Sequence, residues 1–163
     1  EKFVPPRKGR QHVLRVLREL LYLKPEGRGT DIGGALEYLA KVVRRRAVVF
    51  VVSDFLADSY ERPLTVAGRR HDTIVVHMGD EREREFPPIG FLELEDAETG
   101  ERLTVDVTDP AFRAAFERDV TTSADALDRR FRQTGVDVIR ISTDSPYADR
   151  LMRFFRQRAR RFR

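Results

Sequence analysis

The sequence contains no cysteine and no tryptophan, and its longest uninterrupted apolar run, "AVVFVV" at 47–52, has only six residues. The absence of cysteine excludes a disulfide framework and any thiolate metal site. A run of six residues is far too short to cross a bilayer as a helix. We therefore expect a cytoplasmic location for this chain, and membrane association of the full-length protein only through a segment outside it.

Charged residues are plentiful, at 36% of the chain, and 40% of the residues are hydrophobic. This balance predicts a compact core under a densely charged surface rather than a disordered chain. A chain of 163 residues fits one domain, so we expect a single domain over residues 1–163.

Hydrophobic periodicity predicts alternating helices and strands. Apolar residues at helical spacing predict helices over about 11–23, 30–44, 60–69, 110–134 and from 146 onward. Short β-branched runs at 47–54, 73–78 and 136–142 predict strands, and the first reads as a central parallel strand covered on both faces. The alternation indicates an α/β fold with a parallel sheet. Two amphipathic segments within 89–107 predict a β-hairpin that leaves this sheet.

Ligands of open α/β sheets gather where the parallel strands end, so the residues that follow each strand are the candidates for a binding site. Polar residues follow all three: Ser53 and Asp54, Gly79 and Asp80, and 142–144. The helix that begins near Thr30 directly precedes the strand that ends at Asp54, so Thr30 and Asp54 are expected at the same edge. Each has two interpretations, as a helix cap or as a hard oxygen ligand of Mg²⁺. In the first interpretation Thr30 or Asp31 caps the helix.

Three stretches of the sequence resemble the same protein family: "GRGTDIGGALEYLAKVVRRRAVVFVVSDF", "RRHDTIVVHMGDEREREFPPIGFLELEDAETGE" and "YADRLMRFF". They resemble the C-terminal two-thirds of the DUF58 family, a bacterial branch of the von Willebrand factor A domains. The resemblance implies a Rossmann-like three-layer sandwich with a metal-ion-dependent adhesion site. In such a site Thr30 and Asp54 would bind Mg²⁺ or Mn²⁺, with Gly29, Asp31 and Ser53 nearby.

The third part of such a site, an Asp-x-Ser-x-Ser loop after the first strand, is not in the sequence. The resemblance therefore implies an incomplete domain that lacks its first three strands, with residues 2–4 as the end of the third. It also implies an open edge on the strand that ends at Asp54, which self-association or another chain would cover. We expect weak or no Mg²⁺ binding by this chain alone.

The function implied by the resemblance is a protein-interaction module. Its relatives are often encoded beside MoxR-type AAA+ ATPases, so such an ATPase is an expected partner. No nucleophile, base or phosphate-binding motif is visible, so we expect no enzyme activity. The three histidines share no metal-ligand spacing and are expected to be structural.

Two other functions stay open at this point. Asp54 could serve as the key carboxylate of a phosphotransfer or metal-dependent phosphatase-like domain. The last fourteen residues, 150–163, hold seven arginines and no acidic residue, and could bind nucleic acid or another anionic surface. We expect instead that this segment packs on the sheet through Leu151, Phe154, Phe155 and Phe162, with its arginines in solvent, and we expect no nucleic-acid partner.

Overall fold

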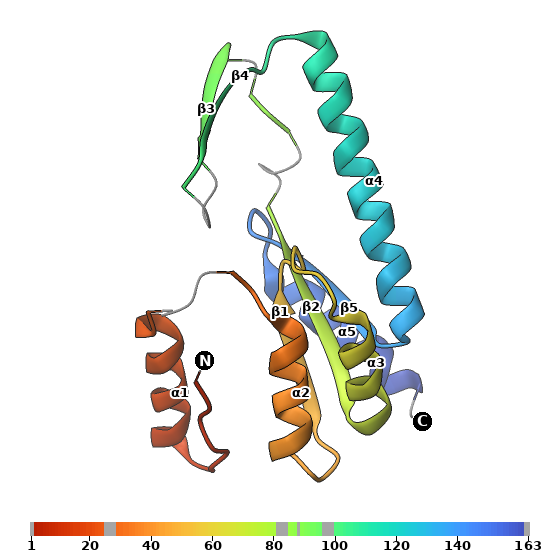
Figure 1. The fold of residues 1–163 in the computed structure, drawn as a ribbon. Coiled ribbons are helices and arrows are strands. Elements are labelled where there is room, and N and C mark those ends of the chain that lie inside the picture. The colour runs from red at the N-terminus through yellow and green to blue at the C-terminus, as the bar shows by residue number, and fades with distance from the viewer. Residues whose placement is uncertain (1, 25–28, 81–84, 88, 96–99, 162–163) are drawn as a thin grey trace. The chain divides into compact units, whose positions relative to one another are not determined.

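The structure is a computed structural model that describes residues 2–24, 29–80, 85–87, 89–95 and 100–161 (Figure 1). The chain forms two compact units, Glu1–Thr30 and Asp31–Arg163.

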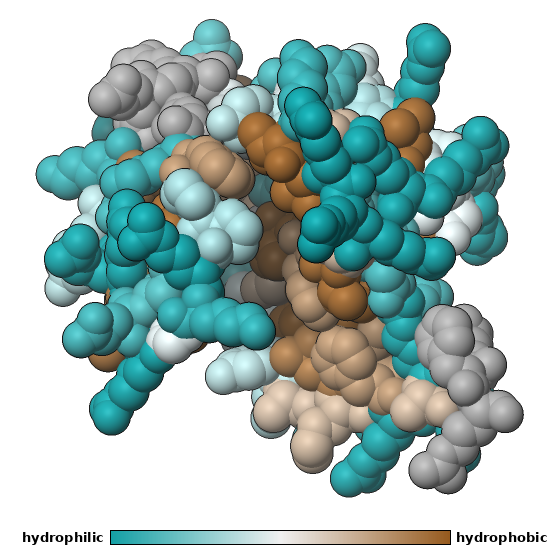
Figure 2. All heavy atoms as spheres, turned by 90° about the horizontal axis from the view of Figure 1, so that it is seen from below, coloured by the Kyte–Doolittle hydropathy of each residue, from teal (hydrophilic) through white to brown (hydrophobic). Residues whose placement is uncertain are grey.

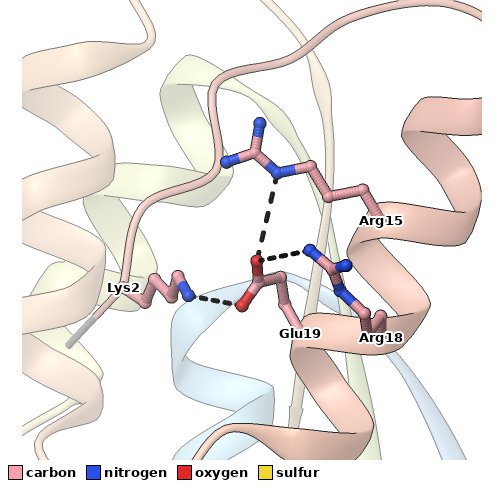
Figure 3. Close-up of polar contacts among 4 residues, drawn as sticks. All are labelled: Lys2, Arg15, Arg18 and Glu19. Atoms are coloured by element: carbon pink, nitrogen blue, oxygen red, sulfur yellow. Dashed lines mark hydrogen bonds and ion pairs between the residues drawn. The ribbon is translucent and has the colours of Figure 1, made fainter.

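The first unit contains helix α1 (Arg10–Tyr22), whose middle carries a cluster of charges (Figure 3). Lys2 donates to the Glu19 carboxylate, and Arg15 and Arg18 lie 4.0 and 3.9 Å from its second oxygen. The hydrogen bond from Lys2 and the positive charges around Glu19 lower the pKa of that carboxyl. Lys2 thus ties the segment before the helix to its last turns. Residues 2–4, expected as the end of a strand, form no strand in this structure, and the described residues of the unit contain no other strand with which they could pair.

The apolar stripe of α1 is present as predicted but is exposed. The helix has no buried residue. The members of the stripe are 49–78% exposed, namely Val13, Leu14, Leu17, Leu20 and Leu21. Among the described residues of its own unit, the helix has no other helix or strand to pack against. Pro25 and Gly27, the helix-breaking residues that follow this helix in the sequence, lie outside the described residues.

The second unit is built on a parallel sheet of β1 (Val48–Ser53), β2 (Asp72–Gly79) and β5 (Asp137–Ser142), in the order β1-β2-β5. Val51 lies beside Val75 in the first pair, and Val76 lies beside Ile139 in the second. The central strand β2 is apolar on both faces, with Ile74 and Val75 at most 1% exposed. The predicted α/β fold with a parallel sheet is confirmed.

Helices cover both faces of β2, because its side chains alternate between the two faces. Val75 packs with α2 (Ile32–Val42), α3 (Glu61–Arg70) and the end of α4 (Pro110–Thr134). Ile74 and Val76 point to the other face, where α5 (Tyr147–Arg161) covers them. Figure 1 shows these helices on the two sides of the sheet. The unit is a three-layer arrangement of helix, sheet and helix.

Strand β1 differs from its prediction as a central strand covered on both faces. Among the described strands it pairs only with β2, so it forms an edge of the sheet. Val51 packs on the α2–α3 side, whereas Val48, Phe50 and Val52 are 59, 47 and 62% exposed. The continuous apolar pattern predicted that other elements pack on both faces of β1. In the described residues only the face that carries Val51 is well covered. The open edge expected for this strand is present.

Helix α4 follows its prediction closely, because both of its ends carry strong local signals. The Asp109 side chain accepts a hydrogen bond from the Ala111 N–H at 3.0 Å, Pro110 occupies the first turn, and Gly135 ends the helix with φ 69°. An antiparallel pair of strands, β3 (Phe91–Glu95) and β4 (Arg102–Asp106), precedes it in the chain. This pair forms a separate two-stranded sheet. It lies in the segment for which the alternating pattern predicted a β-hairpin outside the main sheet.

Helix α5 was predicted to pack on the sheet through its apolar residues and to keep its arginines in solvent, and the structure agrees only in part. Leu151 and Phe154 pack on the sheet as predicted, but Phe155 is 43% exposed. Arg158 forms ion pairs with Asp72 and Asp137, at the N-terminal ends of β2 and β5. The arginine therefore fixes the helix to the sheet rather than projecting into solvent. Phe162 lies outside the described residues.

The surface carries many apolar side chains among its charges. Figure 2 shows one face on which hydrophilic side chains cover most of the area and apolar side chains are exposed between them. In the part of the chain that the structure describes, no helix is both long and apolar enough to cross a membrane.

The α2–α3 side of the core predicts a strong dependence of stability on Leu64, which is fully buried. We expect Leu64→Ala to lower the free energy of unfolding by about 2–5 kcal/mol, because it leaves a cavity between helix and sheet. Val66 on the same helix is 50% exposed, and we expect Val66→Ala to change the same quantity by less than about 1 kcal/mol. Chemical denaturation of both variants measures the difference. Equal losses would contradict this description of the core.

Candidate functional site

Polar residues gather at one edge of the sheet, where its three parallel strands end. Ser53 ends β1, Gly79 ends β2 and Ser142 ends β5. The loop after β5 is held to this edge, because the Thr143 N–H donates to the Gly79 carbonyl at 3.1 Å. The structure therefore brings together the strand ends that the sequence singled out.

Asp54 lies at this edge, immediately after β1, and is exposed. Its Oδ1 accepts hydrogen bonds from the Ser53 hydroxyl at 3.2 Å and from the Leu56 N–H at 3.3 Å. The Ser53 hydroxyl in turn accepts from the Phe55 N–H at 3.0 Å. These bonds fix one oxygen of Asp54 in the turn, and neither of them uses Oδ2. Asp54 does not cap α3, whose N-cap residue is Tyr60.

The loop from Asp54 to Tyr60 has an unusual backbone. Phe55 and Ser59 adopt φ values of 60° and 64°, in the left-handed region that residues other than glycine rarely enter. Phe55 is held there by its buried ring, whose centroid lies 5.1 Å from that of Tyr60 and 5.0 Å from that of Phe131. Burying the Phe55 ring inward leaves the preceding carboxylate exposed at the edge. Strained backbone of this kind is commonest at functional sites.

A cleft of about 700 Å³ opens beside this loop. Its walls are the loop after β1, the end of β2 and the middle of α4. Four aspartates line it, at 54, 58, 80 and 119, together with His77 and Arg130. Apolar side chains of α4 complete the wall, among them Phe116 and Leu127. A cleft with apolar walls and several carboxylates suits a polar or charged group carried on an apolar partner surface.

Arg130 connects α4 to the loop. Its guanidinium lies 3.3 Å from the Glu61 carboxylate and 3.8 Å from that of Asp58. Burial raises the pKa of the Tyr60 hydroxyl, and the neighbouring Arg130 offsets part of that increase. No local sequence pattern marks Arg130, Asp58 or Phe55, because their roles depend on contacts between segments far apart in the chain.

The cap of α2 is Asp31, not Thr30. The Asp31 side chain accepts from the Gly34 N–H at 2.7 Å, and Asp31 is the N-cap residue. A Cβ built on Gly34 would lie 2.2 Å from Asp31 Oδ2, so this cap requires glycine at position 34. Gly29 adopts φ 85°, which also suits glycine. Because Asp31 caps α2, Thr30 does not serve as the helix cap, which was one of its two interpretations from the sequence.

The described residues do not form a complete metal site. Thr30 is the last residue of the first unit and Asp54 belongs to the second. No group of three or more histidine, aspartate or glutamate side chains among the described residues is arranged to hold a metal ion. Mg²⁺ requires about six oxygen ligands in octahedral geometry. The exposed, hard Oδ2 of Asp54 fits one position of such a shell, and the remaining positions need other donors.

Comparisons with known proteins give relatives over nearly the whole chain. A family model described as "Protein of unknown function DUF58" matches residues 1–126. The uncharacterized proteins Mb1516 of Mycobacterium bovis and Rv1480 of Mycobacterium tuberculosis are each 32% identical over 160 residues, 96% of this chain and 50% of each relative. The chain thus spans half the length of these two relatives. Uncharacterized protein MAV169 of Mycobacterium avium is 31% identical over 161 residues, 96% of this chain and 94% of that protein. No solved structure matches.

The capping contact predicts which residue of the pair at 30 and 31 stabilises α2. We expect Asp31→Ala to lower the free energy of unfolding by about 1 kcal/mol, because the Gly34 N–H loses its acceptor. Asp31→Asn keeps an acceptor and should retain most of the stability. Thr30→Ala is the matched control, with an expected change within about 0.5 kcal/mol. Urea denaturation of the three variants tests this order, and a larger loss for Thr30→Ala would contradict it.

The buried hydroxyl of Tyr60 predicts a loss of stability in alkali. Its pKa is raised in the folded chain, so the neutral form is favoured by folding. This contribution is complete below the pKa of an unfolded tyrosine, about 10, and is lost as pH rises through the folded value. We expect the free energy of unfolding to fall more steeply above pH about 10 for the wild type than for Tyr60→Phe. Parallel pH profiles of the two proteins would contradict the assignment.

Proposed function

The chain belongs to the DUF58 family, and from this premise we propose that it is a protein-interaction module of von Willebrand factor A type. The module binds a protein partner at the carboxyl edge of its parallel sheet. The observation that carries the proposal is the exposed carboxylate of Asp54, fixed at that edge by the turn after β1 and flanked by a cleft.

Asp54 is prepared for binding rather than for capping or packing. The hydrogen bonds of the turn use only Oδ1 of Asp54. The neighbouring Phe55 anchors the loop in the core and adopts a positive φ, which is unfavourable for a residue other than glycine. A carboxylate that is fixed before the partner arrives loses little conformational freedom on binding. The loop therefore supports a role for Asp54 in contact with a ligand.

The second part of the proposal concerns a divalent ion. We assign Thr30 and Asp54 to an Mg²⁺ or Mn²⁺ site that needs further oxygen ligands from outside the described residues. When bound, the ion supplies a positive charge to which an acidic side chain of the partner can bind. Asp31 supports this assignment indirectly, because by capping α2 it leaves the hydroxyl of Thr30 available.

The third part concerns the partner. By the resemblance to the DUF58 family, a MoxR-type AAA+ ATPase is the partner that we propose, by analogy alone. The contacts of α5 favour this kind of function over nucleic-acid binding through the tail. Phe154 is packed on the sheet and Arg158 pairs with two aspartates, so neither is free for stacking or phosphate contacts.

The proposal predicts that metal binding depends on the length of the chain. By calorimetry, we expect no saturable Mg²⁺ or Mn²⁺ binding by the 163-residue chain, because Thr30 and Asp54 together fill too little of the coordination shell. Full-length Rv1480, of which this chain covers 50%, should bind the ion and lose it when the residue that aligns with Asp54 is replaced by alanine. Tight binding by the 163-residue chain would contradict the assignment of missing ligands.

Partner capture is tested with the same longer protein and a purified MoxR-type ATPase. We expect binding in Mg²⁺, none in EDTA, and a loss of affinity of at least about tenfold, or ~1.4 kcal/mol, on substitution of the Asp54 equivalent by alanine. The matched control is alanine at the position that aligns with Asp125, which in this chain is an exposed aspartate of α4 that does not line the cleft. Binding that is indifferent to both EDTA and the Asp54 change would refute the proposed function.

A further inference from the structure

A pocket of about 370 Å³ lies between helices α2 and α3 of the second unit. The two helices pack on each other and lie on the same side of the sheet (Figure 1). All the residues that line the pocket lie within 36–71, and none of them lines the cleft beside Asp54. No residue of β1, which the structure describes in full, lines the pocket either. The pocket is thus a feature of the helix layer, separate from the candidate site and from the edge of the sheet.

Contacts near the two ends of the helix pair bound the pocket. Near the N-terminal ends the helices approach closely, because a Cβ built on Gly33 would lie 3.2 Å from the Ser59 carbonyl oxygen and 3.7 Å from Pro63. Near the C-terminal ends the long side chain of Arg70 crosses from α3 to α2, where its Nη1 donates to the Ala40 carbonyl at 2.9 Å. Pro63, Ala40 and Arg70 all line the pocket, which lies between these contacts.

Aliphatic side chains form most of the walls. Leu36 and Ala67 are each 5% exposed and belong to the core, whereas Val66, at 50% exposed, lies nearer to solvent. Walls of this kind favour an apolar ligand, because binding removes apolar surface from water. The volume is more than twice the roughly 150 Å³ of a cavity that holds benzene, so an apolar body of one or two rings fits.

His71 is the buried polar side chain of the pocket. It follows α3 directly, lines the pocket and is 1% exposed. Both ring nitrogens are buried, and neither has a hydrogen-bond partner among the described residues. Buried polar groups without a partner are rare in folded proteins because they are costly. An unpaired imidazole in an otherwise apolar wall is therefore the kind of group that fixes the orientation of a bound ligand.

The polar groups of the pocket favour an uncharged ligand. An uncharged imidazole has one N–H donor and one acceptor nitrogen, and a hydroxyl group can pair with either. Glu37 and Arg62, both exposed, carry opposite charges, and the charge of Arg70 is directed to the C-terminal end of α2. A charged ligand group beside His71 would lose its hydration without gaining a buried opposite charge.

From the cavity, its apolar walls and the unpaired His71 we propose that this pocket binds a small uncharged alcohol or phenol. The apolar body of the ligand lies against Leu36, Val66 and Ala67, and its hydroxyl group forms a hydrogen bond with a ring nitrogen of His71. Because both nitrogens are covered in the structure, the ring turns about its Cβ–Cγ bond to bring one of them to the ligand. The proposal goes beyond the function proposed above and does not depend on it.

Three probes with the same methyl-substituted ring test the proposal: p-cresol carries a hydroxyl group, toluene carries no polar group, and p-toluate carries a negative charge. In titrations of the 163-residue chain followed by NMR, we expect p-cresol to bind saturably and to shift the signals of α2, α3 and the His71 ring. Toluene should bind about three- to tenfold more weakly, because it lacks the hydrogen bond. We expect p-toluate to bind more weakly than p-cresol, because its charge must lose water.

Variants test the location and the role of His71. Val66→Trp places a large ring in the pocket and should lower the affinity for p-cresol at least about tenfold. The matched control is Val42→Trp, at a position of α2 that is 38% exposed and does not line the pocket, and it should leave the affinity unchanged. His71→Phe removes the polar group, so p-cresol and toluene should then bind with similar affinity.

Each part of the proposal has an outcome that contradicts it. No saturable shift with p-cresol up to its solubility limit would show that the pocket holds water only and would overturn the proposal. Equal affinities of the wild type for p-cresol and toluene would refute the role of His71, and tighter binding of p-toluate would refute an uncharged ligand. An unchanged affinity in Val66→Trp would contradict the location. These variants leave Thr30 and Asp54 intact, so the metal and partner experiments are unaffected by the result.

Discussion

The parallel pairing of β1, β2 and β5 is the interaction on which the second unit depends. Because β2 lies between two parallel neighbours, it is apolar on both faces and requires a helix layer on each. Because all three strands run in the same direction, their polar ends meet at one edge. The location of the candidate site is thus a consequence of the direction of the strands, and the loop after β1 then determines how Asp54 is presented there.

Local signals were sufficient for most of the elements and insufficient for the site. Asp109, Pro110 and Gly135 mark the ends of α4 through contacts within a few residues, so its extent could be predicted. The position of Phe55 could not, because a phenylalanine with positive φ is stabilised by rings of Tyr60 and Phe131, which tertiary packing alone brings together. Thr30 and Asp31 were both chemically able to cap α2, and only the geometry distinguishes them.

The incorrect predictions share one physical origin. Apolar periodicity indicates which face of an element seeks cover, and it carries no information on whether the described residues supply that cover. The stripe of α1 and the even-numbered face of β1 are both apolar, and both are exposed within their units. By contrast, Leu151 and Phe154 of α5 find the sheet, with Arg158 fixed to Asp72 and Asp137.

Asp54 lies where β1 ends and the cleft begins. It directly follows β1, the edge strand of the described sheet, and it also borders the cleft at the carboxyl edge of the sheet. Its turn leaves Oδ2 outside both local hydrogen bonds, so one oxygen is available to a cation from either direction. A divalent ion would gain from this negative charge, so its affinity depends both on the turn that holds Asp54 and on the further oxygen ligands that complete the coordination shell.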